Sequence, residues 1–482
     1  MKTIQESSRE VPLLCEEMDV IVIGGGAAGI GAAISAARNG AKTIIIERFG
    51  FFGGSQTAAF DDSFAWVDDR IQGGIVQEIM DDIIAAGMNH KNSPGQVRDH
   101  WANEFGSIFF DGEYYKYLVD NLMEKAGVKV VFHALAADAI VDGDSLKGVI
   151  IESLEGRQAV LGKTIIDCTG IAHIAWKSGA SVTGENGYPD NRFGPFEGMH
   201  MGLGYGFFVR NIDYHKFREF AQANPEQWDY WVKGKELFTK ARAEGKLYSP
   251  RNSCLLTEYE DGRAWIINPY YKLEKGQHPW QVEVVSHAEK DMRKQAWSCW
   301  ELLKDNVPGF ENSRIEQTPS CALLRDGHRI VGEYTLKEED MYGARTFEDS
   351  VSICNMPPDL FFPDGSHHFK FNVTPYDIPY RCLLSKDFDN LLAAGGTSSL
   401  DFITWGAIRY CTPSLTTGQA AGAAAAIAVK DGVSPKDVDV RKVQRQLNNQ
   451  GMLTTNKQVP PEVVAEYARR AEEWGDGFKI SE

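Results

Sequence analysis

A single stretch near the start of the chain constrains the fold more than any other. Residues 19–47 predict a strand, a glycine-rich turn, a helix and a second strand, in that order. The first strand is the continuous apolar run 20–23, which suits a parallel sheet that is covered on both faces. The helix is expected over 28–39 and the second strand over 42–46, where it ends at an acid, Glu47. This order is typical of the first half of a dinucleotide-binding fold.

The glycines and the acid of this unit each have a physical reason. Gly24 permits the tight turn, Gly26 lets the backbone approach a pyrophosphate, and Gly29 lets the helix lie close to the sheet. Amides at the start of the helix attract phosphate charge. A carboxylate at position 47 accepts hydrogen bonds from ribose hydroxyls and repels a 2′-phosphate. The unit therefore predicts binding of FAD or NAD rather than NADP.

The composition limits the class of protein and the kinds of partner that the chain can have. Its 482 residues are 43% hydrophobic and 24% charged, as in an ordinary globular protein. The formal charge of −17 disfavours nucleic acid and anionic lipid as partners. Eight scattered cysteines without a Cys-x-x-Cys pair argue against an iron–sulfur centre. No apolar run reaches the roughly 18 to 20 residues of a membrane span. The first ten residues lack a secretory signal, so we expect a cytoplasmic protein.

Periodicity and turn residues place further elements along the chain. In the first half, helices are expected over 75–88 and 114–126, and strands over 128–133, 146–153, 158–161 and from 164 into a glycine turn at 170. The middle of the chain is rich in tryptophan and tyrosine. Its expected elements are short strands over 206–210 and 264–268 and an amphipathic helix over 285–304. The chain then returns to a buried strand and glycine turn over 390–396 and a helix of small residues over 414–430.

Two other glycine clusters allow a functional interpretation. Gly53 and Gly54 follow the second strand, where cofactors sit in such sheets, and aromatic residues flank them. They predict a loop that faces a flavin, although a surface loop is the plainer alternative. Gly202, Gly204 and Gly206 also alternate, but neither a strand precedes them nor a helix follows. We do not expect a second nucleotide site there.

The order of elements resembles the FAD-dependent oxidoreductases of glutathione-reductase-like fold, in the branch shared with fumarate reductase and succinate dehydrogenase flavoproteins. More narrowly, the chain resembles the bacterial FAD-dependent oxidoreductase family. The segments that carry the resemblance are 22–54, 306–312, 329–334, 378–381 and 406–424. They extend over nearly the whole chain.

This resemblance implies FAD as the cofactor and a set of residues that hold it. The implied FAD contacts are Gly24, Gly26, Ala27, Ala28, Gly29, Glu47, Arg48, Gly53, Gly54, Ser55, Ala136, Thr169, Gly170, Gly395, Gly418 and Gln419. The loop 53–57 contains no histidine, so a histidyl-flavin bond cannot form there and we expect non-covalent FAD. Gly395-Gly396 lacks the acid that hydroxylase-type flavin monooxygenases place at this turn, which lowers the weight of monooxygenation.

The same resemblance implies an α/β fold with a Rossmann-like, glutathione-reductase-like FAD-binding domain and an inserted mixed α+β substrate domain. We expect the FAD-binding domain to comprise residues 17–184 and 376–452. The substrate domain is expected over 185–375, and a C-terminal helical tail over 453–482.

Four residues are candidates for catalysis or substrate binding: His200, Arg325, His328 and Arg409. His328 lies between Arg325 and Arg329, so cationic neighbours would lower its pKa and let it exchange a proton, unless it only joins a structural ion-pair network. Arg409 precedes the helix of small residues and could bind a substrate carboxylate or the cofactor. His200 begins the second domain and could face the flavin, or be a satisfied core residue. No metal site is expected, because His367 and His368 lack further ligands by sequence.

The sequence therefore predicts an FAD-dependent oxidoreductase that transfers a hydride between flavin N5 and a small organic substrate. The direction of the reaction is open, as is the external electron acceptor or donor. A redox-neutral flavoenzyme, such as an isomerase or cyclase using reduced FAD, is one alternative. A non-catalytic FAD-binding protein is another. A homo-oligomer is compatible with either reading.

Overall fold

The first sheet joins segments that lie far apart in the sequence. The computed structural model describes residues 10–90, 107–183, 190–228, 232–369 and 373–474. The strands of this sheet are β1 (Met18–Ile23), β2 (Thr43–Ile46), β5 (Lys129–Val131), β6 (Leu135–Asp142), β7 (Ser145–Ser153), β8 (Gly156–Asp167) and β18 (Leu391–Ala393). They follow the order β5-β2-β1-β8-β7-β6, and β18 pairs with the second half of β8.

The core of this sheet is parallel. Strands β5, β2, β1, β8 and β18 all run in the same direction. Val20, Ile21 and Val22 of β1 are completely buried, as expected for a central strand that is covered on both faces. The carboxyl ends of β1, β2, β8 and β18 therefore meet at one edge, which is where ligands bind in such sheets. The predicted α/β class is confirmed.

One strand prediction needs a correction. Segments 158–161 and 164–167, expected as separate strands, form the single twelve-residue strand β8. Its first part pairs antiparallel with β7 and its second part pairs parallel with β1. The sequence suggests a break at Gly162, but this glycine pairs with Met18 inside the ladder, and a Cβ there would come within 2.7 Å of Ile21. Gly162 therefore serves close packing rather than a turn.

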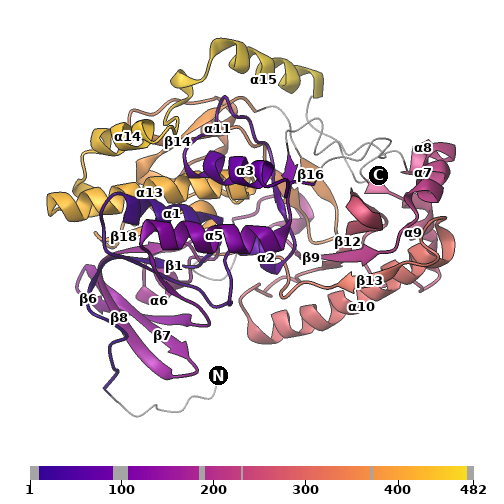
Figure 1. Ribbon diagram of the computed structural model, residues 1–482, viewed down its shortest axis with the longest axis horizontal. Coiled ribbons are helices and arrows are strands. Elements are labelled where there is room, and N and C mark those ends of the chain that lie inside the picture. Colours follow the sequence, from indigo (N-terminus) through magenta and orange to yellow (C-terminus); the bar gives the residue numbers. More distant parts are fainter. Residues whose placement is uncertain (1–9, 91–106, 184–189, 229–231, 370–372, 475–482) are drawn as a thin grey trace.

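Two helices pack against each other beside this sheet through glycines. They are α1 (Ala27–Arg38) and α13 (Cys411–Asp431), and Figure 1 shows them side by side. A Cβ on Gly31 would lie 2.2 Å from the Leu415 carbonyl oxygen, and one on Gly422 would lie 2.2 Å from that of Ala32. These approaches leave no room for a methyl group. Nearby helices are α2 (Ser55–Ala58), α3 (Ile75–Ala85), α5 (Gly112–Ala126) and α6 (His173–Ser178).

Replacement of Gly418 by alanine should destabilise this helix pair. Its Cβ would lie 2.0 Å from the Ala28 carbonyl oxygen, a backbone atom that cannot move without distorting the start of α1. We expect Gly418→Ala to lower the free energy of unfolding by about 2 kcal/mol, as overpacking commonly does, measured by chemical denaturation. Gly112→Ala is the control, because no atom lies within 4 Å of its Cβ position. Equal stability of the two variants would contradict this account of the packing.

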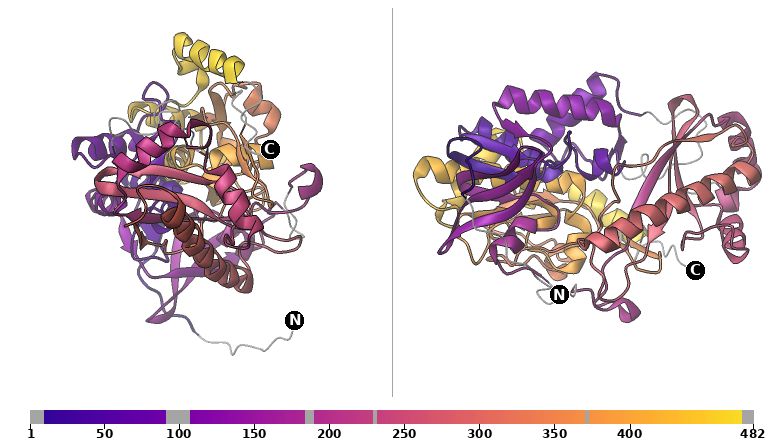
Figure 2. Two further views of the ribbon diagram at one scale, coloured as in Figure 1. Left: turned by 90° about the vertical axis from the view of Figure 1, so that its right-hand side faces the viewer. Right: turned by 90° about the horizontal axis from the view of Figure 1, so that it is seen from below.

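A second lobe carries an antiparallel sheet. Its strands and helices are β9 (Leu203–Arg210), β10 (Val232–Lys233), β11 (Cys254–Tyr259), β12 (Arg263–Tyr271), β13 (Arg314–Gln317), α7 (Tyr214–Ala223), α8 (Pro225–Trp228), α9 (Lys235–Ala243) and α10 (Val282–Asn306). The strand order is β10-β11-β12-β9-β13, and α10 packs against β9, β12 and β13. Figure 2 shows this lobe beside the first, with α10 along its length.

The rest of the chain covers both lobes and returns to the first sheet. Its elements are β3 (Ser63–Phe64), β4 (Ile108–Phe109), α11 (Glu338–Tyr342), β14 (Ser350–Cys354), β15 (Asp359–Phe361), β16 (His367–Phe369), β17 (Tyr376–Pro379), α12 (Phe402–Ile408), α14 (Val440–Asn449) and α15 (Pro461–Trp474). The expected domain boundary at 184/185 lies outside the described residues, and the domain limits stay a prediction. Within the described ranges, no helix is long and apolar enough to cross a membrane.

Candidate functional site

The glycines of the turn between β1 and α1 differ in how much space surrounds their Cβ positions. Gly24 has φ +95°, and a Cβ there would lie 2.5 Å from the Cys168 carbonyl oxygen. A Cβ on Gly29 would lie 1.8 Å from the Gly24 oxygen. Gly26, the N-cap of α1, differs because its nearest neighbour would be the Gly54 Cα at 3.8 Å. The space above Gly26 is therefore open, and it faces a helix N-terminus whose amides suit a phosphate.

Glu47 braces this turn from the end of β2. Its carboxylate is buried; Oε2 accepts a hydrogen bond from the Gly25 amide at 2.6 Å and Oε1 accepts one from the Phe49 amide at 2.8 Å. Each carboxylate oxygen has a second lone pair, so ribose hydroxyls can still be bound. The structure thus gives Glu47 a structural role that the sequence does not reveal. Its contact with a ribose stays a prediction.

The Gly53-Gly54 loop lies directly against the same turn. Gly53 has φ +113° and Gly54 has φ +55°, conformations that favour glycine. The Gly53 amide donates to the Gly25 oxygen at 2.8 Å, and a Cβ on Gly54 would lie 2.9 Å from the Gly26 Cα. The two glycine segments therefore form one cradle, and bulkier residues would fill it. This cradle fits the pyrophosphate of a dinucleotide such as FAD.

The remaining predicted cofactor residues lie around this edge of the sheet. A Cβ on Gly395 would lie 3.1 Å from that of Ala28. Gly170 has φ +78° with no atom within 4 Å of its Cβ position. Gln419 instead accepts a hydrogen bond from the Ile75 amide at 2.9 Å and so holds the start of α3. Of the other predicted residues, Ala27 lies on α1, Ser55 on α2 and Ala136 on β6, whereas Arg48 follows β2 and Thr169 follows β8. Their contacts with FAD stay predictions.

Three arginines from distant segments form a second cluster, which we call the arginine site: Arg251, Arg325 and Arg409 with Asp61, Asp359 and Tyr410. The guanidinium carbon of Arg325 lies 3.9 Å from the ring centre of Phe361. That of Arg251 lies 5.0 Å from the same ring centre. The sequence predicted Arg325 and Arg409, and the structure brings them together.

Among the described residues of this site, Arg409 is the arginine with a carboxylate partner, Asp359. Its Nη2 donates to the Asp359 Oδ2 at 3.0 Å and to the Asp359 carbonyl oxygen at 2.9 Å. The Tyr410 hydroxyl donates to the same carboxylate. Burial disfavours the Arg409 cation, but the negative neighbours outweigh it and raise its pKa. Asp359 is therefore occupied by Arg409 and Tyr410.

Arg251 and Arg325 have buried N–H groups without hydrogen-bond partners. These are Nε of Arg325 and both Nε and Nη2 of Arg251, judged over the described part of the chain. Burial and the nearby Arg325 lower the pKa of Arg251 to about 10. Burial and Arg409 lower the pKa of Arg325 in the same way. Arginine is not deprotonated in proteins at neutral pH, so both side chains carry a positive charge.

Asp61 places a carboxylate beside these arginines. It follows the Gly53-Gly54 loop and α2, and its side chain has no hydrogen-bond partner among the residues that the structure describes. Burial raises its pKa, and Asp359 adds to this, although Arg325 and Arg409 oppose the shift. The neighbouring Asp62 is different: its Oδ1 accepts the Tyr259 hydroxyl at 2.8 Å, and burial raises its pKa to about 8. Asp61 is therefore the carboxylate available for chemistry.

The alternating glycines of β9 make room for this site. A Cβ on Gly204 would lie 2.8 Å from the Nε of Arg325, and one on Gly202 would lie 2.3 Å from the Tyr270 ring. The Tyr270 hydroxyl accepts the Gly202 amide at 2.8 Å. Gly204 thus lies in β9 and Gly202 directly before it, and the two glycines leave room for bulky side chains.

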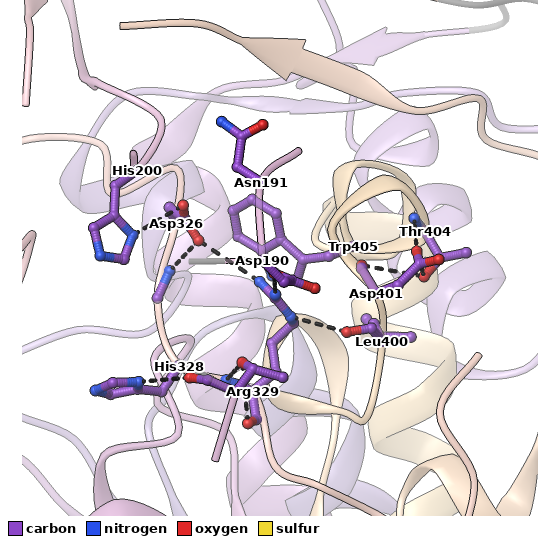
Figure 3. Close-up of polar contacts among 12 residues, drawn as sticks. Asp190, Asn191, His200, Asp326, His328, Arg329, Leu400, Asp401, Thr404 and Trp405 are labelled. Atoms are coloured by element: carbon purple, nitrogen blue, oxygen red, sulfur yellow. Dashed lines mark hydrogen bonds and ion pairs between the residues drawn. The ribbon is translucent and has the colours of Figure 1, made fainter. Parts of the chain in front are cut away.

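The two predicted histidines lie in another cluster. His200 Nδ1 lies 3.0 Å from the Asp326 Oδ2, and Figure 3 shows the ring pointing at this carboxylate. His200 Nε2 lies 2.9 Å from Nδ1 of His278. His328 Nδ1 lies 3.1 Å from the Thr183 oxygen, and its ring centre is 4.0 Å from that of Trp280. His200 and His328 are therefore brought together around Trp280.

The expected cause of the His328 pKa shift needs a correction. Its pKa is lowered, as predicted, but burial is the main cause, with His200 and Arg329 adding smaller effects. Arg329 is itself occupied: its Nε donates to the Leu400 oxygen at 3.0 Å, and its Nη2 pairs with Asp190 (Figure 3). Its Nη1 lies 3.7 Å from the Asp326 Oδ1. The segment around His328 thus contains the structural ion pairs that were the alternative interpretation.

Several residues of these clusters are missing from the sequence predictions. They are Asp61, Arg251, His278, Trp280, Asp359 and Tyr410. The pair Asp61-Asp62, directly after the Gly53-Gly54 loop, is a signal that could have been used. Arg251 and His278 carry no such signal, because they come from irregular segments of the middle region.

The chain is similar to several known proteins. The chain is 29% identical over 178 residues to the thiamine thiazole synthase of Methanococcus vannielii. The aligned region covers 35% of this chain and 62% of that protein. A geranylgeranyl bacteriochlorophyll reductase-like structure from Thermoplasma acidophilum matches 95% of this chain and 97% of its own at 14% identity and a TM-score of 0.49. The p-nitrophenol 4-monooxygenase of Pseudomonas putida matches 96% and 90% at 10% identity and a TM-score of 0.45. At these TM-scores neither structure indicates a substrate.

The family comparison covers most of the chain. The model described as FAD dependent oxidoreductase matches residues 19–447, which include the glycine cradle, the arginine site and α13. FAD is therefore the cofactor, and the protein is an enzyme. This chain belongs to the FAD dependent oxidoreductase family.

Proposed function

We propose that this enzyme oxidises or reduces a small organic substrate that binds at the arginine site. When bound, FAD supplies a hydride acceptor or donor at its N5. The glycine cradle would hold the pyrophosphate, with Glu47 at the adjacent ribose. The residues of the arginine site would then bind the substrate, orient it and exchange its proton.

The observation that carries this proposal is that both lobes contribute to the arginine site next to the cofactor cradle. Gly418, which contacts Ala28 at the start of α1, lies in the first half of α13, and Arg409 is the C-cap of α12, two residues before α13 begins at Cys411. At about 1.5 Å per residue, Cys411 and Gly418 are about 10 Å apart along α13. FAD is long enough to reach from the cradle to this site. Arg325 and Arg251 approach from the second lobe.

The chain's own residues can complete such a reaction. In substrate oxidation, two electrons and one proton leave a carbon atom as a hydride, and a second proton leaves the attached oxygen or nitrogen. The Asp61 carboxylate would accept that second proton, because it lies at the site without a hydrogen-bond partner. In substrate reduction, the protonated Asp61 would return it.

Anaerobic reduction tests this function. The purified flavoprotein is mixed with a panel of hydroxy acids, amino acids, amines, sugars and phenols while the visible flavin absorption is followed. We expect one class to bleach the flavin with formation of one equivalent of oxidised product. Conversion of a panel compound without consumption of an electron acceptor would identify the redox-neutral alternative instead. Isolation without flavin, together with no uptake of added FAD, would overturn the proposal.

We also propose that the enzyme works in the cytoplasm. All eight cysteines are free thiols, six of them buried, which suits the reducing cytoplasm. We propose an external electron acceptor or donor.

A further inference from the structure

We infer that the substrate carries a carboxylate and that Arg325 and Arg251 hold it at the arginine site. This inference rests on the proposed function and names the substrate class for that site. It goes further because it assigns binding roles to two particular side chains, one of which, Arg251, has no sequence signal.

The first argument is the balance of charge. Arg409 is neutralised by Asp359, which leaves Arg325 beside Asp61 and Arg251 beside Arg325. Two buried cations against one carboxylate leave a single excess positive charge when Asp61 is ionised. A buried charge without a hydrogen-bonded partner is unfavourable, so a ligand that supplies one negative charge is expected there. A monoanionic carboxylate matches this excess, whereas a dianionic phosphate would exceed it and would be repelled by Asp61.

The second argument is the unused donors. Aromatic rings cover the faces of these guanidinium groups: Phe361 lies under both, and Tyr270 lies 4.8 Å from Arg251. Stacking of this kind satisfies the face of a guanidinium but not the N–H groups in its plane. The Nε of Arg325 and the Nε and Nη2 of Arg251 remain buried and unbonded within the described ranges. Such a planar fork of donors matches a carboxylate in a bidentate arrangement.

Arg329 shows what a structural buried arginine looks like in the same fold. It is as deeply buried as Arg325, yet its Nε is bound to the Leu400 oxygen and it forms ion pairs with Asp190 and Asp326. Within the described ranges, its Nη1 and the Nε of Arg409 also lack hydrogen bonds, but both of these arginines have a carboxylate partner. Among the described side chains, none forms an ion pair with Arg325 or Arg251, and this difference argues that their partner is a ligand.

The backbone around the two arginines is shaped to admit them. A Cβ on Gly204 would lie 2.8 Å from the Nε of Arg325, and one on Gly365 would lie 3.3 Å from the Cγ of Arg251. Glycines at both positions let the long side chains reach the same aromatic ring. The two guanidinium groups are therefore held by packing before any ligand binds, which reduces the entropy cost of binding.

Calorimetric titration of the FAD-loaded enzyme with propionate, a monoanionic carboxylate, tests this inference. Propionamide serves as the neutral analogue and inorganic phosphate as the competing oxyanion, all at one chloride concentration. We expect propionate to bind, propionamide not to bind, and phosphate to bind at least about tenfold more weakly. Arg325→Met and Arg251→Met should each weaken propionate binding at least about tenfold, whereas Arg325→Lys, which keeps the charge but loses the fork, should fall between.

Arg314→Met is the matched control, because it removes the same charge from an exposed position of β13 in the same lobe. It should bind propionate as the unmodified enzyme does. FAD content and thermal unfolding of each variant show whether it is folded. Propionate binding that survives both Arg325→Met and Arg251→Met, or phosphate binding more tightly than propionate, would overturn the inference. Flavin bleaching by neutral substrates alone would refute the inference but keep the function, whereas propionate binding without reaction of any compound would do the reverse.

Discussion

Replacement of Gly26 by valine should yield a folded protein that no longer retains FAD. Gly26 has an ordinary extended backbone, and its Cβ position is 3.8 Å from the nearest atom, so the fold itself has room for a side chain. The same space is where the glycine cradle and the start of α1 would hold the pyrophosphate. A valine there would displace a phosphate rather than a protein atom. We expect FAD binding to weaken at least about a hundredfold, or about 2.7 kcal/mol.

Titration of the apoprotein with FAD, followed by flavin fluorescence, measures this effect. Gly112→Val is the control, since that position is open but lies on α5, away from the cradle. Gly26→Ala should give an intermediate affinity. Unchanged FAD affinity in Gly26→Val, with the protein folded by circular dichroism, would show that the pyrophosphate does not lie over Gly26.

Replacement of Asp61 by asparagine should remove most of the substrate-dependent flavin reduction while FAD binding persists. Asparagine keeps the size of the side chain but cannot accept a proton. Loss of a general base commonly lowers the rate by about 10²- to 10⁴-fold. The carboxylate does not contact the cradle glycines, so the loss should appear in kcat. Rapid-mixing measurement of flavin bleaching, with the substrate that the panel identifies, gives this rate.

The role of Asp61 also predicts how the rate changes with pH. Burial raises the pKa of Asp61 above its ordinary value, and only the ionised form accepts a proton. The rate of substrate oxidation should therefore fall as the pH drops through this raised pKa, and Asp61→Asn should abolish that limb of the profile. For a substrate that is reduced, the rate should fall as the pH rises instead.

Asp62→Asn is the control for Asp61→Asn. The pKa of Asp62 is about 8, so its carboxyl group is already largely neutral at pH 7, and it is hydrogen-bonded to Tyr259. Equal loss of activity in both variants would contradict the role of Asp61.

Local patterns predicted the cofactor half of the molecule well. The turn at Gly24 to Gly29 and the helix of small residues are each continuous in sequence, so their physical reasons can be seen in one segment. The structure extends the latter helix to α13, Cys411–Asp431. The sequence failed where one strand serves two pairings, as in β8, because a glycine inside a ladder looks like a glycine in a turn.

The arginine site illustrates why the substrate half could be predicted only in part. Arg325 and Arg409 stand out in sequence, but their roles depend on Arg251 and Asp61, which the chain brings in from distant, irregular segments. Likewise His200 and His328 are neighbours because His200 contacts Asp326, two residues before His328, and because both rings contact Trp280. Charge, burial and unbonded donors are properties of such assemblies, and they cannot be read from any single segment.

A crystal structure of the FAD-bound enzyme is the most direct test of the central claim, that the arginine site is where the flavin meets its substrate. The position of the flavin ring relative to Arg325 and Asp61 is the quantity to measure. This account predicts the pyrophosphate over Gly26 and a ring whose reactive face opens onto the Arg325 guanidinium and the Asp61 carboxylate. A ring that lies away from both residues, for instance against Trp280 and His328, would contradict it.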